Sequence, residues 1–331
     1  MKRFSVLGLL VGLALLTLLV TWQGWTRITE VLQVIGWRVV WLPTYFLVPL
    51  GCALLSWWYL FPPNPRPRLT LSAYCTWINF AVNWLLPVAQ VGGELARIRL
   101  LIKRKFPPGE AIASVVGDQT LQIISQALYA LMGVILLTLT QSHGSTINLQ
   151  KHSLPLFLLV GGSLVVLTLI SAGLYWLQHQ GLFQLFSKIA RKFPAFGTET
   201  LNAQATTLDE AIMAMYQRRD RLLIATLWRI GFRLLAAGET WLTLRFLGYP
   251  VGLIDALILE SLGQAVRSAA FLLPGGLGAQ EGGLMAIGAV LGIPINLGLS
   301  LSLCKRIREL VIGVPGLIAL QLEEGKSLLR T

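Results

Sequence analysis

Proline, glycine and glutamate interrupt an apolar segment at Leu85-Leu86-Pro87-Val88-Ala89-Gln90-Val91-Gly92-Gly93-Glu94. Both flanks of this segment are basic, with Arg66 and Arg68 before it and 103–105 after it. Lysine and arginine collect in the cytoplasmic loops of membrane proteins, so both flanks are expected on the cytoplasmic side. A helix that enters the membrane, breaks and returns to the same side is a re-entrant hairpin, which we expect near 69–102.

The whole chain is more apolar than a soluble protein. Hydrophobic residues make up 55% of its 331 positions and charged residues only 13%, and the mean hydropathy is +0.68. Soluble domains carry about 25% charged residues, whereas one membrane span needs about 20 mostly apolar residues. The composition therefore predicts one integral membrane domain, 1–331, in the class of all-α polytopic membrane proteins.

The apolar runs predict about six full spans and two broken segments. The full spans are expected near 4–20, 39–61, 111–140, 154–176, 222–247 and 297–322. The broken segments are expected near 69–102, in a first half 1–177, and near 253–293, in a second half 222–331. Between the halves, 178–221 is expected to be a cytoplasmic amphipathic linker, either lying on the membrane surface or forming an ordinary linker helix. This alternation places both termini in the cytoplasm.

The second broken segment matches the first in its spacing. Leu272-Leu273-Pro274 repeats Leu85-Leu86-Pro87, and each proline is followed seven residues later by a glutamate, Glu94 or Glu281. Glycines lie in both intervals, namely Gly92 and Gly93 in the first and Gly275, Gly276 and Gly278 in the second. Paired breaks in an inverted repeat indicate the substrate site of a transporter. The alternative is coincidence, because such residues are common in membrane helices.

Ionisable side chains inside the apolar segments are costly, at about 2.5–3.5 kcal/mol each on insertion scales. Six are cations: Arg229, Arg233, Arg267, Lys305, Arg306 and Arg308. Six are carboxylates: Glu94, Asp118, Glu239, Glu260, Glu281 and Glu309. Further polar residues share helical faces, namely Asn79 with Asn83, and Asp118 with Gln122 and Gln126.

These charges have two interpretations. One is structural ion pairing, of Glu94 with Arg229 for instance. The other is a polar cavity for an anionic or zwitterionic lipid headgroup, because arginine suits phosphate groups. The amino ends of the half-helices after the two breaks would add hydrogen-bond donors to such a cavity.

Other classes of site have little support in the sequence. The three cysteines lie far apart and the three histidines lie at segment edges, so neither a metal nor a cofactor is expected. A net charge of +12 would indicate nucleic acid in a soluble protein. Here the basic residues lie in short loops beside anionic headgroups, so the expected partners are membrane lipids and not nucleic acid.

The stretch Asn83–Glu94 resembles the signature of the flippase-like transmembrane domain of lysylphosphatidylglycerol synthases, in particular the branch of hopanoid-biosynthesis-associated membrane proteins. Residues 113–118, 274–283 and 306–310 also resemble that pattern, and the resemblance covers nearly the whole chain. It implies a protein of the bacterial inner membrane that moves or handles a phospholipid or a hopanoid-related lipid. The synthases join this domain to a soluble aminoacyl-transferase domain. This chain ends at Thr331 without one, so no enzymatic activity and no catalytic residue are expected.

The favoured hypothesis is therefore lipid translocation. Glu94 and Glu281 are expected to fix the hairpin tips and the six cations to hold the headgroup, with Asn83, Asp118 and Glu309 in the same site. One alternative is a membrane enzyme for a lipid-linked substrate, with Asp118 or Glu94 as a base. The other is a non-transporting scaffold that binds lipid-biosynthesis enzymes through 178–221.

Overall fold

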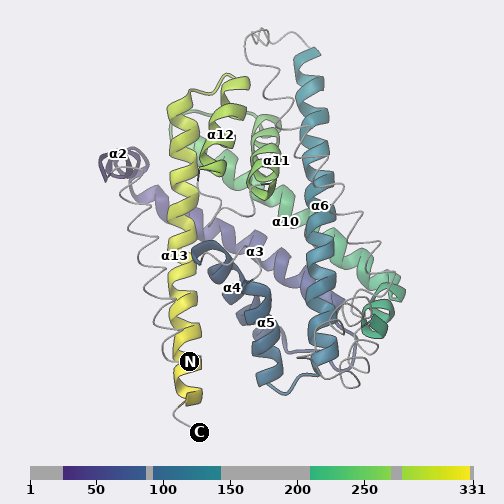
Figure 1. Cartoon of the computed structure of the whole chain (residues 1–331). Helices are drawn as coiled ribbons and strands as arrows, with labels where there is room; N and C mark the ends of the chain where they lie inside the picture. Colours follow the sequence, from purple (N-terminus) through teal and green to yellow (C-terminus); the bar gives the residue numbers. More distant parts are fainter. Residues whose placement is uncertain (1–24, 87–91, 143–208, 270–277, 329–331) are drawn as a thin grey trace, which may run out of the picture.

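The computed structural model describes residues 25–86, 92–142, 209–269 and 278–328, and within these ranges it contains helices and no strand (Figure 1). Residues 209–217 are helical, and the other elements are α2 (Trp25–Ile35), the 3-10 helix η1 (Gly36–Val40), α3 (Trp41–Leu60), α4 (Leu69–Leu85), α5 (Gly92–Lys103), α6 (Pro108–Ser142), α10 (Arg219–Phe246), α11 (Leu253–Ala269), α12 (Ala279–Val290) and α13 (Ile295–Leu328). The all-helical prediction is confirmed for this part of the chain. The expected spans 4–20 and 154–176 and the break residues Pro87, Pro274, Gly275 and Gly276 lie outside the described residues.

The hydropathy pattern located the long helices well. The expected spans 39–61, 111–140, 222–247 and 297–322 correspond to α3, α6, α10 and α13. Two stretches among the described residues, Thr29–Leu60 and Pro108–Thr140, are long and apolar enough to cross a membrane. The total of six spans stays a prediction.

Each broken segment forms two helices that pack against each other, α4 with α5 and α11 with α12. The second helix of each pair has only 12 residues. Such a helix is about 18 Å long, whereas the hydrocarbon core of a bilayer is about 30 Å thick. Neither short helix can cross the bilayer alone, as the predicted hairpins require.

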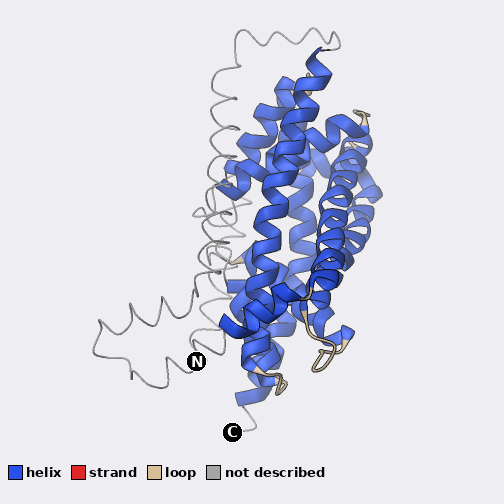
Figure 2. Ribbon diagram, turned by 90° about the vertical axis from the view of Figure 1, so that its right-hand side faces the viewer, coloured by secondary structure: helices blue, strands red, loops and turns tan. Residues whose placement is uncertain are grey.

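The two hairpins occupy opposite ends of the molecule, with α4 and α5 at the lower end of Figure 1 and α11 and α12 at the upper end. The long helix after each hairpin packs against the first helix of the other hairpin, so that α6 contacts α11 and α13 contacts α4. α3 and α10 pack along each other and pass between α6 and α13. Figure 2 shows the same helices from the side as one closely packed bundle.

Each hairpin has its own apolar cluster. Around the first hairpin, Trp57 of α3 and Phe61, which directly follows α3, pack with Ile78 of α4 and Leu101 of α5. Around the second, Leu259 and Leu262 of α11 pack with Ile287 of α12 and other residues of α13 and α6. The two clusters anchor the hairpins at the two ends of the bundle.

The described end of the predicted linker 178–221 packs against the bundle. Within it, α10 already begins at Arg219, and Ile212 and Met215 are buried. Met215 lies directly against Gly117 of α6, where a side chain would collide with it. The side chains of Ile212 and Met215 are buried against other parts of the protein. This end of the linker is therefore part of the helical core. The face formed by 182–189 lies outside the described residues.

Gly93 is expected to be indispensable for the close packing of the first hairpin. A Cβ atom there would collide with the side chain and the backbone carbonyl of Asn79. Gly93→Ala should therefore lower the free energy of unfolding by about 1–3 kcal/mol, measured as thermal unfolding of the purified protein in detergent. The control is Gly282→Ala in α12, where nothing lies within 4 Å of the new Cβ and a gain of about 0.5–1 kcal/mol is expected. Equal stability of the two variants would contradict the packing argument.

Candidate functional site

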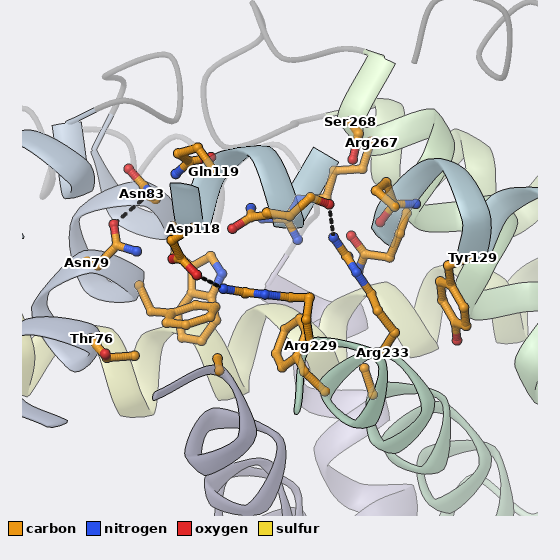
Figure 3. Close-up of a pocket in the computed structure, with 18 of the residues that line it drawn as sticks. Thr76, Asn79, Asn83, Asp118, Gln119, Tyr129, Arg229, Arg233, Arg267 and Ser268 are labelled. Atoms are coloured by element: carbon orange, nitrogen blue, oxygen red, sulfur yellow. Dashed lines mark hydrogen bonds and ion pairs between the residues drawn. The ribbon is translucent and has the colours of Figure 1, made fainter. Parts of the chain in front are cut away.

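A cavity of about 390 Å³ lies between the two hairpins and is also lined by α3, α6, α10 and α13 (Figure 3). Most of the predicted site residues line it, namely Asn83, Glu94, Asp118, Arg229, Arg233, Arg267, Lys305 and Arg308. Glu281, Arg306 and Glu309 are buried behind this lining. The helical packing thus brings the charges of both halves of the chain around one space.

Asp118 of α6 joins three helices on one side of the cavity. Its Oδ2 atom accepts a hydrogen bond of 2.8 Å from Arg97 of α5, and its Oδ1 atom accepts one from Arg229 of α10 (Figure 3). The expected pair of Glu94 with Arg229 is therefore wrong, because α10 brings Arg229 to α6 and not to the hairpin tip. Arg97 also lies over the ring of Trp57, with 4.3 Å between its Cζ and the ring centroid.

Glu94 is held by amides at the tip of the first hairpin. Asn83 donates to both of its carboxylate oxygens, at 3.2 and 3.1 Å, and Gln119 of α6 donates as well. The Oδ1 atom of Asn83 accepts the backbone N–H of Gly93 at 2.9 Å. One donor at the amino end of α5 is therefore already taken by the protein, which leaves fewer backbone donors for a ligand than expected.

Lys305 is the centre of a second charged cluster. Its Nζ atom lies 2.7 Å from Glu260 and 4.0 Å from Glu239. Glu260 also accepts hydrogen bonds from Thr240 and from Gln264 of its own helix. These contacts tie α10, α11 and α13 together at the cavity.

Arg308 connects this charged cluster to a group of aromatic side chains, the aromatic wall, which consists of Phe46, Phe80, Trp84 and Phe232. Its Nε atom lies 3.2 Å from Glu239, and its guanidinium lies over the ring of Phe46, with 3.8 Å from Cζ to the centroid. Phe46 in turn packs edge-on against Phe80, Trp84 and Phe232. The cavity thus combines charged groups with an apolar aromatic surface, which suits an amphipathic ligand.

The three predicted residues outside the lining support the walls. Glu309 accepts from Arg267 at 2.7 Å and from Arg306 at 3.0 Å. Glu281 lies 3.4 Å from Arg306 and accepts hydrogen bonds from Ser302 and from the backbone N–H of Gly278. Glu281 therefore attaches the tip of the second hairpin to α13.

Arg233 differs from the other cations of the cavity. Its Nη2 atom donates to the backbone carbonyl of Gln122 at 3.1 Å, and its Nε atom has no partner. Among the described residues no carboxylate lies within ion-pairing distance of it, whereas each of the other lining cations has one. Ion pairing alone consequently does not account for Arg233.

The lining as a whole is positively charged. Its cations are Arg97, Arg229, Arg233, Arg267, Lys305 and Arg308, and its carboxylates are Glu94, Asp118, Glu239 and Glu260. Arg97 is an addition to the expected site residues, although it follows Glu94 by three residues and therefore shares its helical face. Tyr129 and the aromatic wall are further additions, for which a single apolar sequence contains no signal.

We expect the ion pairs of Asp118 to contribute strongly to the free energy of unfolding, and we expect the side chain of Arg233 to contribute little to it. Asp118→Asn leaves Arg97 and Arg229 buried beside a neutral amide, and removal of one partner from a buried ion pair costs about 3–5 kcal/mol. Arg233→Gln removes a cation that has no carboxylate partner, so the melting temperature in detergent should change little. Similar destabilisation by the two substitutions would show that Arg233 is paired after all.

Comparison with known proteins bears on the identity of this chain. No curated protein and no solved structure matches it. The family model described as the lysylphosphatidylglycerol synthase TM region matches residues 5–316, which is most of the chain. Together with the apolar helices, this match indicates a membrane protein with a lipid-related role. The chain belongs to the family of the lysylphosphatidylglycerol synthase transmembrane region.

Proposed function

We propose that this protein translocates a lipid across the bacterial inner membrane, with both of its termini in the cytoplasm. The headgroup passes through the cavity between the hairpins while the acyl or terpenoid part stays in the hydrocarbon. The substrate is a phospholipid or a hopanoid-related lipid, in line with the resemblance to the hopanoid-associated branch. The observation that carries this proposal is a positively charged cavity of about 390 Å³ within an apolar helical bundle.

The outer surface of the long helices supports a bilayer-embedded cavity. On α6, the exposed residues Leu128, Leu131 and Ile135 lie on the face opposite to the cavity-lining Asp118 and Gln122. α10 has the same arrangement, with exposed Leu223, Leu227, Ile230 and Leu234 and inward-facing Arg229 and Arg233. An apolar outside and a charged inside reverse the pattern of a soluble helix and suit a protein surrounded by lipid.

The helix boundaries support the inverted repeat, which is part of the proposal. The starts of α5 and α12 (92 and 279), their ends (103 and 290) and the starts of α6 and α13 (108 and 295) all differ by 187 residues. The same offset relates the anchors of the tips, because Glu94 contacts Gln119 and Glu281 contacts Arg306. Such repeats let one hairpin close the cavity towards one side while the other opens towards the opposite side.

The chemistry of the lining supports a headgroup that carries phosphate. Arginine binds phosphate through a planar fork of donors. Three of the five charged lining residues on α5 and α10 are arginines, namely Arg97, Arg229 and Arg233, and Figure 3 shows Arg229 and Arg233 among the residues of the lining. The aromatic wall offers an apolar surface for the glycerol or terpenoid part next to the headgroup. No bond has to be made or broken in this process, so the lining needs only to replace the water around the headgroup.

Filling the cavity should block translocation. Ser268 lines the cavity, and its side chain makes no hydrogen bond to another described residue. In vesicles that contain fluorescent phospholipids, the wild-type protein should expose inner-leaflet label to an impermeant reductant. Ser268→Trp should slow this exposure at least about tenfold, since each 1.4 kcal/mol of barrier corresponds to one such factor. The control is Ser300→Trp on α13, which lies outside the lining.

The outcomes separate the proposal from its alternatives. Label movement no faster than in protein-free vesicles would refute translocation, and full activity of folded Ser268→Trp would refute this cavity as the route. Chemical turnover of the lipid in the same vesicles would support a membrane enzyme. Copurified lipid-biosynthesis enzymes that are lost when 178–208 of the predicted linker is replaced, with the packed residues 209–221 kept, would support a scaffold.

A further inference from the structure

One part of the cavity wall contains buried polar atoms that have no partner. Both amide atoms of Gln126 lack a hydrogen bond within the described structure, and so do the Tyr129 hydroxyl and the Arg233 Nε atom. Gln126 is only 2% exposed and Tyr129 only 5%. All three residues line the cavity.

These three side chains lie close together. Gln126 and Tyr129 are three residues apart on α6, which places them on one face of that helix. Arg233 reaches the same face from α10, because its guanidinium donates to the carbonyl of Gln122 one turn before Gln126. Tyr129 and Arg233 are neighbours in Figure 3. Their free donors thus converge from two helices on one end of the cavity.

A buried polar atom without a partner is unfavourable and rare in folded proteins. Here an amide, a hydroxyl and a guanidinium share this condition at one place. The Nε atoms of Arg97, Arg229 and Arg308 in the same lining also lack a hydrogen bond, but each of those guanidiniums has a carboxylate partner. The free atoms are mainly donors and include the Nε atom of Arg233, whose guanidinium has no carboxylate within ion-pairing distance among the described residues. A tetrahedral oxyanion with a single negative charge satisfies several donors at once and neutralises this charge.

We propose that Arg233, Gln126 and Tyr129 form a binding site for one phosphate group, either the phosphodiester of a lipid headgroup or a phosphate ion. Arg233 neutralises the group through its Nε side, and Gln126 and Tyr129 donate to the remaining oxygens. This inference rests on the proposed function, since it assigns a position in the cavity to the phosphate of the translocated lipid. It adds Gln126 and Tyr129 to the residues that recognise the substrate.

Binding to the purified full chain in detergent tests the proposal independently of transport. Isothermal titration uses three probes, namely dioctanoyl phosphatidylglycerol, inorganic phosphate and dioctanoylglycerol. The first should bind and the third, which lacks phosphate, should not. Binding of inorganic phosphate with equal affinity would identify a free phosphate ion as the ligand, and no binding of it would identify the lipid phosphodiester.

Substitutions locate the site. Arg233→Gln should weaken binding at least about tenfold, the effect of losing one hydrogen bond from a charged donor. Tyr129→Phe should weaken it about fivefold, as expected for a neutral hydrogen bond. Arg245→Gln should leave binding unchanged, because Arg245 is an exposed arginine of the same helix outside the cavity.

Gln126→Leu distinguishes a binding role from a structural one. The substitution removes a buried amide that has no partner, so the melting temperature without ligand should stay equal or rise. The increase in melting temperature caused by dioctanoyl phosphatidylglycerol should nevertheless become smaller. A lower melting temperature without ligand, or wild-type binding by all three variants, would overturn the proposal.

The two proposals can fail separately. If the wild-type protein moves lipid and the three variants bind phosphatidylglycerol normally, the phosphate site is wrong and translocation stands. If the variants lose binding but the wild-type protein moves no lipid, the phosphate site stands and translocation is wrong.

Discussion

An ionisable side chain within an apolar helix needs a partner inside the protein, because hydrocarbon provides none. This constraint organises the whole bundle. Asp118 satisfies it by joining α5, α6 and α10, and Glu309 satisfies it by holding Arg267 and Arg306 between α11 and α13. The ion pairs consequently connect helices that are distant in the sequence and place them around one cavity. Breaking such a pair is costly, so these contacts specify the arrangement of the helices as well as the charge of the lining.

The same constraint applies to the backbone at the breaks. A helix that begins inside the bundle has amino-terminal N–H groups that need acceptors. In the first hairpin, the side chain of Asn83 accepts from Gly93, and in the second, the side chain of Glu281 accepts from Gly278. Each tip is then attached to the long helix that follows it. The hairpins are thus held by side chains at their tips and by apolar clusters at their bases.

The sequence alone predicts where the helices lie along the chain better than it predicts which charged side chains contact one another. Hydropathy located α3, α6, α10 and α13, and the glycines and prolines indicated both hairpins, because these signals are local. The pairing of charges depends on how α10 approaches α6, which no local pattern specifies. For this reason the sequence alone suggests Glu94 with Arg229 as one possible ion pair, whereas Arg229 contacts Asp118 and Glu94 binds amides. Arg97 was overlooked because its role appears only once α5 has folded back towards α6. The positions of Glu281, Arg306 and Glu309 behind the lining likewise follow from helix packing.

Stability and binding place different demands on the charges of this cavity. A lining in which every charge is paired is rigid, but it offers little to a charged ligand because its groups are already satisfied. A lining with many unpaired charges would bind anions strongly, but burial without partners would destabilise the fold. The structure combines the two conditions. Paired carboxylates and cations form most of the wall, and among the described lining residues the one cation without a carboxylate within ion-pairing distance, Arg233, lies beside the free amide of Gln126 and the free hydroxyl of Tyr129. A phosphate that enters there gains hydrogen bonds without displacing an existing ion pair, so it can leave again without the bundle having to refold.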